Sequence, residues 1–220
     1  MRPVIEGLRE RKKRLMREQL SDTAARMFMQ RGFDGLRVAE VAQACGVSEK
    51  TVFNYFPTKE ALLLDRLETT MTALRGGLAD PAVPPVAAAL RILDTELDGL
   101  TAAGDRDPAG WAAGHRRFGD LIDAAPSLRA YRNDMMDRFV AVAAEMLAGR
   151  AGMAVGDPEP QIAAAALLGL WRVQFQSLRR HLAEDASVPE IRERVRADVR
   201  RAARVVEDGL GAVPAFHPPA

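Results

Sequence analysis

Long apolar runs are missing from this sequence of 220 residues. A membrane-spanning helix needs about 18 to 20 consecutive apolar residues. The longest candidate, Ile162 to Trp171, is too short and continues directly into Arg172. The N-terminus has no apolar signal-peptide core, because Glu6 and the basic run 11–14 interrupt it. We therefore expect a cytoplasmic protein.

Cysteine and histidine are also scarce. The single cysteine, Cys45, excludes an internal disulfide and fits a reducing compartment. The three histidines, His115, His181 and His217, do not combine with it into a metal-ligand spacing. The sequence has neither a Gly-x-Ser-x-Gly elbow nor a glycine loop that would cradle a phosphate. We expect no metal, no cofactor and no enzymatic activity.

Strand-like alternation of apolar and polar residues is absent as well. Val, Ile and Thr are scattered among Ala, Leu, Arg and Glu, which is a composition typical of helices. Glycine, proline and capping residues divide the chain, with stop or start signals at Gly32, Thr58, Asp107, Asp157 and Ser187. The sequence predicts an all-α fold of about nine helices: 9–31, 37–44, 48–55, 58–78, 85–103, one opened by Pro108, 126–149, 158–181 and 189–209.

Charge is unevenly spread along the chain. The net charge is only +1, but residues 1–60 carry twelve basic and eight acidic side chains, so the remainder is net negative. All four lysines lie in these first 60 residues. A basic N-terminal part on a mildly acidic body suits a domain that contacts phosphate, although a solvated helix face would have the same composition.

One segment, residues 35–56, has the pattern of two short helices joined at an angle. Val38, Val41 and Ala42 form an apolar stripe, and Gly46 stands where a sharp turn needs positive φ. Ser48 is placed to cap the second helix, in which two apolar residues four apart, at positions 52 and 56, face inward. The other faces remain outward, which is the construction of a helix-turn-helix whose second helix enters the DNA major groove.

At this point the sequence resembles the TetR family of transcriptional regulators. The resemblance covers about residues 16–67, and its most specific parts are Val41-Ala42, Gly46-Val47-Ser48, residues 51–56 and Lys59-Glu60-Ala61-Leu62. It implies a helix-turn-helix domain at 9–60 with its recognition helix at about 48–55. It also implies a helical ligand-binding and dimerisation domain at 61–210. We expect the tail, 211–220, to be loose.

The resemblance also implies a function. Members of the family bind a palindromic operator as homodimers, usually as repressors, and release it when a small molecule fills the C-terminal domain. By position, the expected DNA-binding residues are Arg37, Val38, Ser48, Glu49, Lys50, Thr51, Phe53, Asn54, Tyr55 and Lys59. Many members have Thr where this chain has Arg37. Lys59 would hold a phosphate, helped by the helix dipole.

The basic run 9–17 has two interpretations. It is either the solvated start of the first helix or an arm that reaches the neighbouring minor groove or phosphates. Basic side chains at a helix start oppose the helix dipole, which favours the arm weakly.

The C-terminal helices suggest both a dimer interface and a pocket. The helix 158–181 is apolar nearly all round in its first half, so it must be covered on more than one side. We expect it to form a four-helix bundle with the last helix across a two-fold axis. Large side chains at helical spacing are candidates for an apolar effector pocket, although such residues are more often plain core: Trp111, His115, Phe118, Tyr131, Met135, Phe139, Trp171 and Phe175.

The sequence thus predicts a ligand-responsive DNA-binding regulator, most simply a repressor, with double-stranded DNA, a small largely apolar effector and a second copy of the chain as partners. Two alternatives stay open. The motif could be only a scaffold in a helical small-molecule-binding protein or enzyme, or the fold could serve as an architectural module without an effector.

Overall fold

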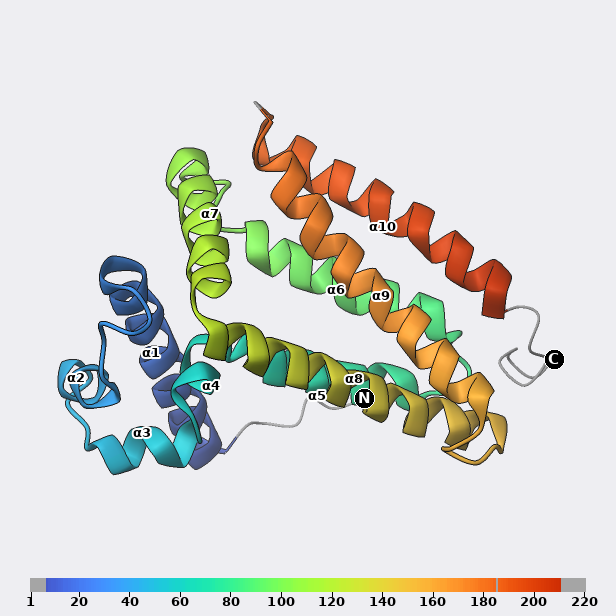
Figure 1. Ribbon diagram of the computed structural model, residues 1–220, viewed down its shortest axis with the longest axis horizontal. Helices are drawn as coiled ribbons and strands as arrows, with labels where there is room; N and C mark the ends of the chain where they lie inside the picture. Colours follow the sequence, from blue (N-terminus) through green and yellow to red (C-terminus); the bar gives the residue numbers. More distant parts are fainter. Residues whose placement is uncertain (1–6, 185, 211–220) are drawn as a thin grey trace. The chain divides into compact units, whose positions relative to one another are not determined.

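The computed structural model describes residues 7–184 and 186–210, and this part of the chain is helical throughout (Figure 1). It contains ten helices and no strand: α1 (Leu8–Arg31), α2 (Val38–Ala44), α3 (Glu49–Tyr55), α4 (Lys59–Leu63), α5 (Arg66–Ala79), α6 (Pro85–Thr101), α7 (Pro108–Ala124), α8 (Pro126–Ala151), α9 (Pro158–His181) and α10 (Val188–Leu210). The all-α prediction is confirmed. The predicted tail, 211–220, lies outside the described residues.

Proline and glycine fix most helix boundaries where the sequence predicted them. Helices α6 to α9 each begin at a proline, a residue that loses no hydrogen bond at the first helical position. Helix α1 ends at Gly32, whose φ of 81° suits glycine and whose N–H donates to the carbonyl of Phe28. Predicted and observed ends of α6 and α8 differ by only about two residues, as expected for fraying helix ends.

The predicted caps have mixed outcomes. Asp107 caps α7, since its Oδ1 accepts from the N–H of Gly110 at 3.0 Å. Asp157 does not cap α9, because its carboxylate accepts instead from the N–H of Ala154 in the preceding loop, at 2.9 Å. The carboxylate of Glu190 accepts from the N–H of Ser187 at 2.9 Å, half of the predicted capping box.

The predicted single helix 58–78 is wrong. It is two helices, α4 and α5, separated at Leu64, whose ψ of 31° leaves the helical range. The four consecutive side chains 61–64 are all at most 7% exposed. Because four consecutive residues point in all directions around one helical turn, a straight surface helix cannot bury them all. The break at Leu64 allows all four side chains to be buried. Because of it, the described residues form ten helices where about nine were predicted.

The chain forms two compact units, each with its own core. The first contains the described residues up to Arg66 together with 117–132. In it, α1 packs against α2 and α4, and α2 packs against α3. The fully buried side chains of this unit include Leu20, Phe28, Leu36, Phe56 and Leu62. This core holds α2 and α3 in place, which at seven residues each are too short to be stable alone.

The second unit contains residues 67–116 and the described residues from Asn133 onward. Helices α9 and α10 lie side by side and antiparallel, and both contact α6 (Figure 1). Ion pairs cross from α10 to α6 and to the segment after it: Arg196 with Asp98 at 2.6 Å, and Arg192 with Asp105 at 3.0 Å. The second unit therefore has an apolar interior, and ion pairs join its helices at the edge.

Candidate nucleic-acid interface

Helices α2 and α3 form the predicted helix-turn-helix. Each is seven residues long, and the turn between them passes through Gly46, whose φ is 69°. This conformation is cheap for glycine and strained for other residues, so the predicted role of Gly46 is confirmed. Val41, Val52 and Phe56 are at most 1% exposed, as the spacing predicted. The inward face of α3 is thereby fixed to the core of the first unit.

The start of α3 is held by a side-chain cap. The Oγ of Ser48 accepts from the N–H of Thr51 at 3.0 Å, and the two hydroxyl oxygens lie 2.7 Å apart in a second hydrogen bond. Such a cap stabilises a helix by about 1 kcal/mol. Both residues were expected to contact DNA. Their hydroxyl groups are tied to each other, and they retain lone pairs and a donor for one further partner.

The outward face of α3 carries the side chains expected to meet base edges or phosphates. Glu49, Lys50, Phe53 and Asn54 are exposed, and Tyr55 is half-buried. Phe53 is 43% exposed, so its ring is available for a contact outside the protein. This face combines donors, acceptors and an apolar ring, the groups that distinguish base pairs in the major groove.

The start of α2 carries the next expected contacts. The side chain of Arg37 is 84% exposed, so its guanidinium can reach away from the protein. Glu40 holds the backbone here, because its carboxylate accepts from the N–H of Arg37 at 2.9 Å and pairs with Arg31 at 2.7 Å. These two interactions, in that order, hold the pKa of Glu40 below its ordinary value. Val38 is only 8% exposed, and as the first residue of α2 its backbone N–H has no partner within the helix, so that N–H is the group that could meet a phosphate.

Lys59 begins α4 and was expected to hold a phosphate. Its ammonium lies 4.4 Å from the ring centre of Phe33 and 5.6 Å from that of Phe28. A cation over an aromatic face gains about 0.5 to 1 kcal/mol at an exposed site. The rings therefore hold the ammonium close to the start of a helix capped by Thr58, whose Oγ1 accepts from the N–H of Ala61 at 3.1 Å.

The basic run 9–17 lies on α1, which starts at Leu8. Arg9, Arg11, Lys12 and Lys13 are exposed. Arg17 differs from them, because its guanidinium pairs with Asp65 and donates to the carbonyl oxygen of Tyr55. Neither interpretation of the run anticipated this contact.

Comparisons with known proteins agree with this geometry. A family model described as bacterial regulatory proteins of the tetR family matches residues 20–65. A second, described as the MftR C-terminal domain, matches residues 94–211, more than half of the chain. The chain belongs to the TetR family of transcriptional regulators. As a TetR-family regulator it is a DNA-binding helix-turn-helix protein and not an enzyme.

Two curated relatives of this TetR-family chain are regulators too. It is 28% identical over 151 residues to the mycofactocin biosynthesis transcriptional regulator MftR of Mycobacterium tuberculosis, covering 69% of this chain and 73% of the relative. It is 26% identical over 178 residues to the regulator TcmR of Streptomyces glaucescens, covering 76% and 74%. A TetR-family regulator structure from Mesorhizobium loti is 20% identical, with a TM-score of 0.48 over 86% of this chain and 96% of that one.

The eight residues expected to line an effector pocket are divided between the two units of this TetR-family chain. Phe118 and Tyr131 belong to the first unit, and the other six belong to the second. Within the second unit, Met135 and Phe139 are at most 1% exposed and form part of its core. Phe175 is 40% exposed, with the guanidinium of Arg179 lying 5.8 Å from its ring centre. The helical spacing in the sequence thus selected, as one set of pocket candidates, side chains that have different surroundings in the structure.

The remaining three make polar contacts inside the second unit. The indole N–H of Trp111 donates to the carbonyl of Leu100 at 2.7 Å, and Nδ1 of His115 lies 3.2 Å from the carbonyl oxygen of Trp111. The indole N–H of Trp171 donates to one carboxylate oxygen of Glu96 at 3.0 Å, and Thr70 donates to the other at 2.5 Å. Helices α5, α6 and α9 therefore meet at the carboxylate of Glu96.

Sequence reasoning missed Glu96 and Arg17, although both left a signal. Arg17 continues the inward positions of α1, which are Leu20 and Ala24, at helical spacing. Glu96 is flanked in the same way by the buried residues of α6. A charged residue on an otherwise apolar helix face needs a specific partner, and this rule marks both positions.

Two features are absent from the described part of the chain. No helix there is long and apolar enough to cross a membrane. Residues 7–184 and 186–210 also contain no group of three or more His, Cys, Asp or Glu side chains that could hold a metal ion.

Proposed function

We propose that this TetR-family regulator is a homodimeric repressor that binds a palindromic operator and is released by a small, largely apolar effector. Residues 9–60 would contact DNA, and residues 61–210 would bind the effector and the second copy. The proposed DNA contacts are Arg37, Val38 through its backbone, Ser48, Glu49, Lys50, Thr51, Phe53, Asn54, Tyr55 and Lys59.

The observation that carries the DNA contacts is the division of α3 into two faces. Val52 is 1% exposed and faces the core, whereas Phe53 and Asn54 are exposed on the other side of a helix only seven residues long. A polar side chain such as Asn54 can pair with an adenine edge, and an exposed ring such as Phe53 can contact a thymine methyl group. The cap at Ser48 keeps the first turn of this helix formed.

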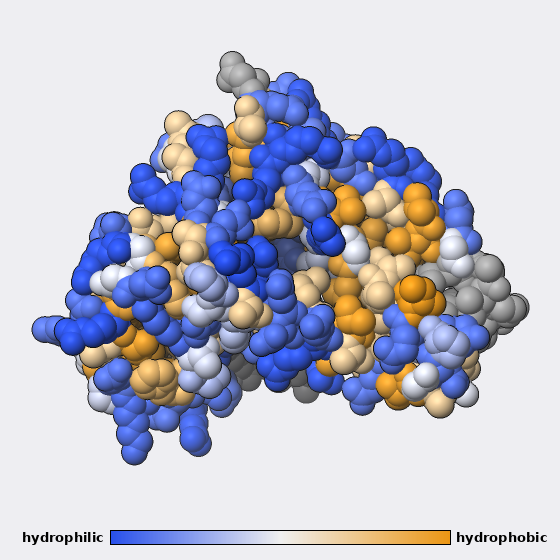
Figure 2. Space-filling model, viewed as in Figure 1, coloured by the Kyte–Doolittle hydropathy of each residue, from blue (hydrophilic) through white to orange (hydrophobic). Residues whose placement is uncertain are grey.

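The proposed dimer rests on the apolar surface of α9 and α10. Ile162 on α9 is 67% exposed and Val205 on α10 is 71% exposed. Figure 2 shows apolar side chains gathered over the end of the second unit where α9 begins and α10 ends. An exposed apolar patch of this kind marks an interaction site. Because two-fold dimers join the same patch on both copies, two helices from each copy would form a four-helix bundle.

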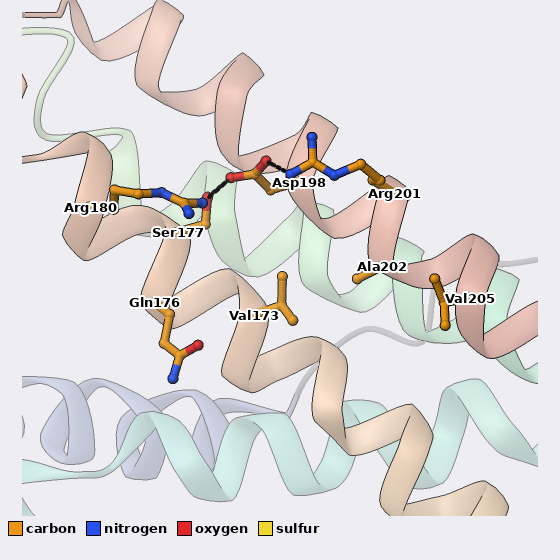
Figure 3. Close-up of a pocket in the computed structure, with 8 residues that line it drawn as sticks. All are labelled: Val173, Gln176, Ser177, Arg180, Asp198, Arg201, Ala202 and Val205. Carbon is orange, nitrogen blue, oxygen red and sulfur yellow. Dashed lines mark hydrogen bonds and ion pairs between the residues drawn. The ribbon is translucent and has the colours of Figure 1, made fainter.

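A groove between α9 and α10 continues this surface (Figure 3). Its apolar part consists of Val173, Ala202 and Val205. Its polar part is already paired within one chain, since Asp198 accepts from Ser177 at 2.7 Å and from Arg201 at 2.8 Å. A partner helix would therefore meet an apolar strip bordered by satisfied charges, an arrangement that resembles the apolar centre and polar rim of protein interfaces.

For the effector, we propose a molecule with an apolar body and one hydrogen-bond donor that meets Glu96. Trp171 and Thr70, the two donors on this carboxylate, come from different helices, and the neighbouring positions of α6 are apolar. A donor on the ligand would compete with one of them and separate the helices that now meet there. Trp111 and His115, whose rings contact each other where Trp111 donates to the carbonyl of Leu100 on α6, are further candidates for effector contacts.

Release would follow from the spacing of the two recognition helices in a dimer. They must lie about 34 to 36 Å apart to enter successive major grooves on one face of DNA. An effector that binds better to a dimer with another spacing lowers DNA affinity by thermodynamic linkage. The same linkage requires operator DNA to lower the affinity of the effector.

The decisive experiment is selection of bound fragments from a pool of random duplex DNA, followed by footprinting on the recovered fragments. We expect an inverted repeat whose half-site centres lie about one helical turn apart, protected by two copies of the chain. Recovery of no sequence, or binding that does not depend on salt, would rule out the operator-binding repressor.

A separate experiment tests the effector. A panel of apolar compounds with and without a hydrogen-bond donor is screened by thermal shift, and hits are added to the protein–DNA complex. We expect donor-bearing hits to raise the melting temperature and release DNA, and Glu96→Gln to reduce that response. Hits that bind without changing DNA affinity would contradict the proposed regulation.

A further inference from the structure

We infer that Arg17 is a positioning residue for the recognition helix and not a phosphate contact. Its Nε donates to Oδ1 of Asp65 at 2.8 Å, and its Nη1 donates to the carbonyl oxygen of Tyr55 at 3.1 Å. Its guanidinium carbon also lies 4.7 Å from the ring centre of Phe56. One side chain of α1 thus joins the end of α3 to the short connection between α4 and α5, all inside the first unit.

The end of α3 needs such a partner. The last four carbonyl oxygens of a helix have no partner within it, and Tyr55 is the last residue of α3. A guanidinium at this end satisfies one carbonyl and also interacts favourably with the negative end of the helix dipole. With Ser48 capping the first turn, both ends of this seven-residue helix are held by side chains.

Asp65 determines what Arg17 can do. Its side chain is 18% exposed and that of Arg17 is 36% exposed, so the pair is partly shielded from solvent. The carboxylate neutralises the guanidinium and holds it against Tyr55 and Phe56, which prevents it from extending to a phosphate. The planar fork of arginine makes these contacts together, whereas lysine offers one point charge and cannot reproduce them.

The affinity test of this inference rests on the proposed operator binding. The two interpretations of Arg17 predict opposite results for Asp65→Asn. If Arg17 positions α3, loss of its anchor weakens binding to a selected fragment about tenfold to a hundredfold, the value of one or two charged hydrogen bonds. If Arg17 binds phosphate, removal of the competing carboxylate strengthens binding to every fragment.

The probes are one fragment recovered by the selection and a shuffled fragment of the same length, each titrated at several salt concentrations. We expect Arg17→Ala, Arg17→Lys and Asp65→Asn to lose affinity for the selected fragment only, with an unchanged salt slope. Arg26→Ala is the matched control, because Arg26 is exposed on the same helix and lies outside the basic run 9–17. A slope that falls by about one in Arg17→Ala, together with rescue by Arg17→Lys, would overturn the inference.

A second measurement needs no DNA, so it separates failure of this inference from failure of operator binding. Amide hydrogen exchange is followed in the full-length protein at residues 52–56. We expect about tenfold faster exchange in Arg17→Lys and Asp65→Asn, from the loss of about one charged hydrogen bond. In Arg26→Ala the exchange rate should not change. Arg17→Lys is the conservative variant should Asp65→Asn fail to fold. Unchanged protection at residues 52–56 in Arg17→Lys contradicts the inference.

Discussion

The exposed faces of α3 and of the α9–α10 pair differ in chemistry. The face of α3 combines an amide, a carboxylate, an ammonium and one ring, and it is carried by a helix of seven residues. The face of α9 and α10 exposes Ile162 and Val205, and it is carried by helices of 24 and 23 residues. One face is short and polar, and the other contains an apolar strip, bordered by charges, on much longer helices.

The difference follows from what each face would bind. A DNA groove is hydrated and charged, so contacts to it exchange water for hydrogen bonds and need polar groups held in fixed positions. A second protein chain offers apolar surface, and burial of about 25 cal/mol per Å² rewards extended contact. The short helix therefore needs caps at both ends, whereas the long helices are stabilised along their whole length by the core of their own unit.

The strongest test of this comparison places a charge on the apolar face. We expect Ile162→Glu and Val205→Glu to raise the dimer dissociation constant by at least about a hundredfold, because an unpaired charge in a buried contact costs about 3 to 5 kcal/mol. Sedimentation equilibrium measures it. Arg204→Glu, at an exposed and already charged position next to Val205, is the control. Dimers of unchanged stability in both variants would remove α9 and α10 as the interface.

A second test concerns base recognition by the polar face. We expect Asn54→Ala to reduce discrimination at one base pair of a selected fragment by about 1 to 3 kcal/mol, the value of a good side-chain pairing with a base edge. Competition binding with single-base variants of the fragment measures it. Gln43→Ala, exposed on α2, is the control. An equal loss on every fragment would assign Asn54 to a phosphate instead.

Most of the fold could be predicted from the sequence because its boundaries are local. Pro85, Pro108, Pro126 and Pro158 act through their own backbone, and Gly46 through its own φ. The break at Leu64 could not be predicted in this way. It depends on which neighbours bury residues 61–64, and periodicity alone does not contain that information.

The candidate site shows the same limit. The four-residue spacing of Val52 and Phe56 predicted that they face inward. The remaining positions of α3 were then predicted to face outward. The contact between Arg17 and Asp65 joins residues 48 positions apart, and that between Trp171 and Glu96 joins residues 75 apart. Long-range polar pairs of this kind need the folded chain, although a charged residue on an apolar helix face indicates that a partner exists.

A third test separates two roles of Lys59. If its ammonium binds a phosphate, Lys59→Ala should weaken binding to all fragments and lower the salt slope by about one. If the ammonium serves only Phe33, the slope stays constant and the protein loses about 0.5 to 1 kcal/mol of stability. Binding at several salt concentrations, with denaturant unfolding of the same variant, distinguishes them. Arg26→Ala, exposed on α1 and outside the basic run 9–17, is the control for charge alone.

The smallest expected effect compares two capping carboxylates, one in each unit. Glu40 and Glu190 each stand third in their helix and accept from the N–H of the residue before it, Arg37 or Ser187. The pKa of Glu40 is lowered first by that N–H and next by the Arg31 guanidinium. The pKa of Glu190 is lowered first by the hydroxyl and then by the N–H of Ser187.

Because the pKa of each carboxylate is lowered in the folded state, each one stabilises its unit at pH values above the ordinary glutamate pKa. That stabilisation is lost as pH falls through the lowered value. Added salt screens an exposed ion pair more than a neutral hydrogen bond. We therefore expect the pKa of Glu40, followed by NMR titration, to rise more between low salt and about 1 M salt than that of Glu190. Arg31→Gln should abolish the difference, and equal shifts in the unchanged protein would show that the guanidinium contributes little at Glu40.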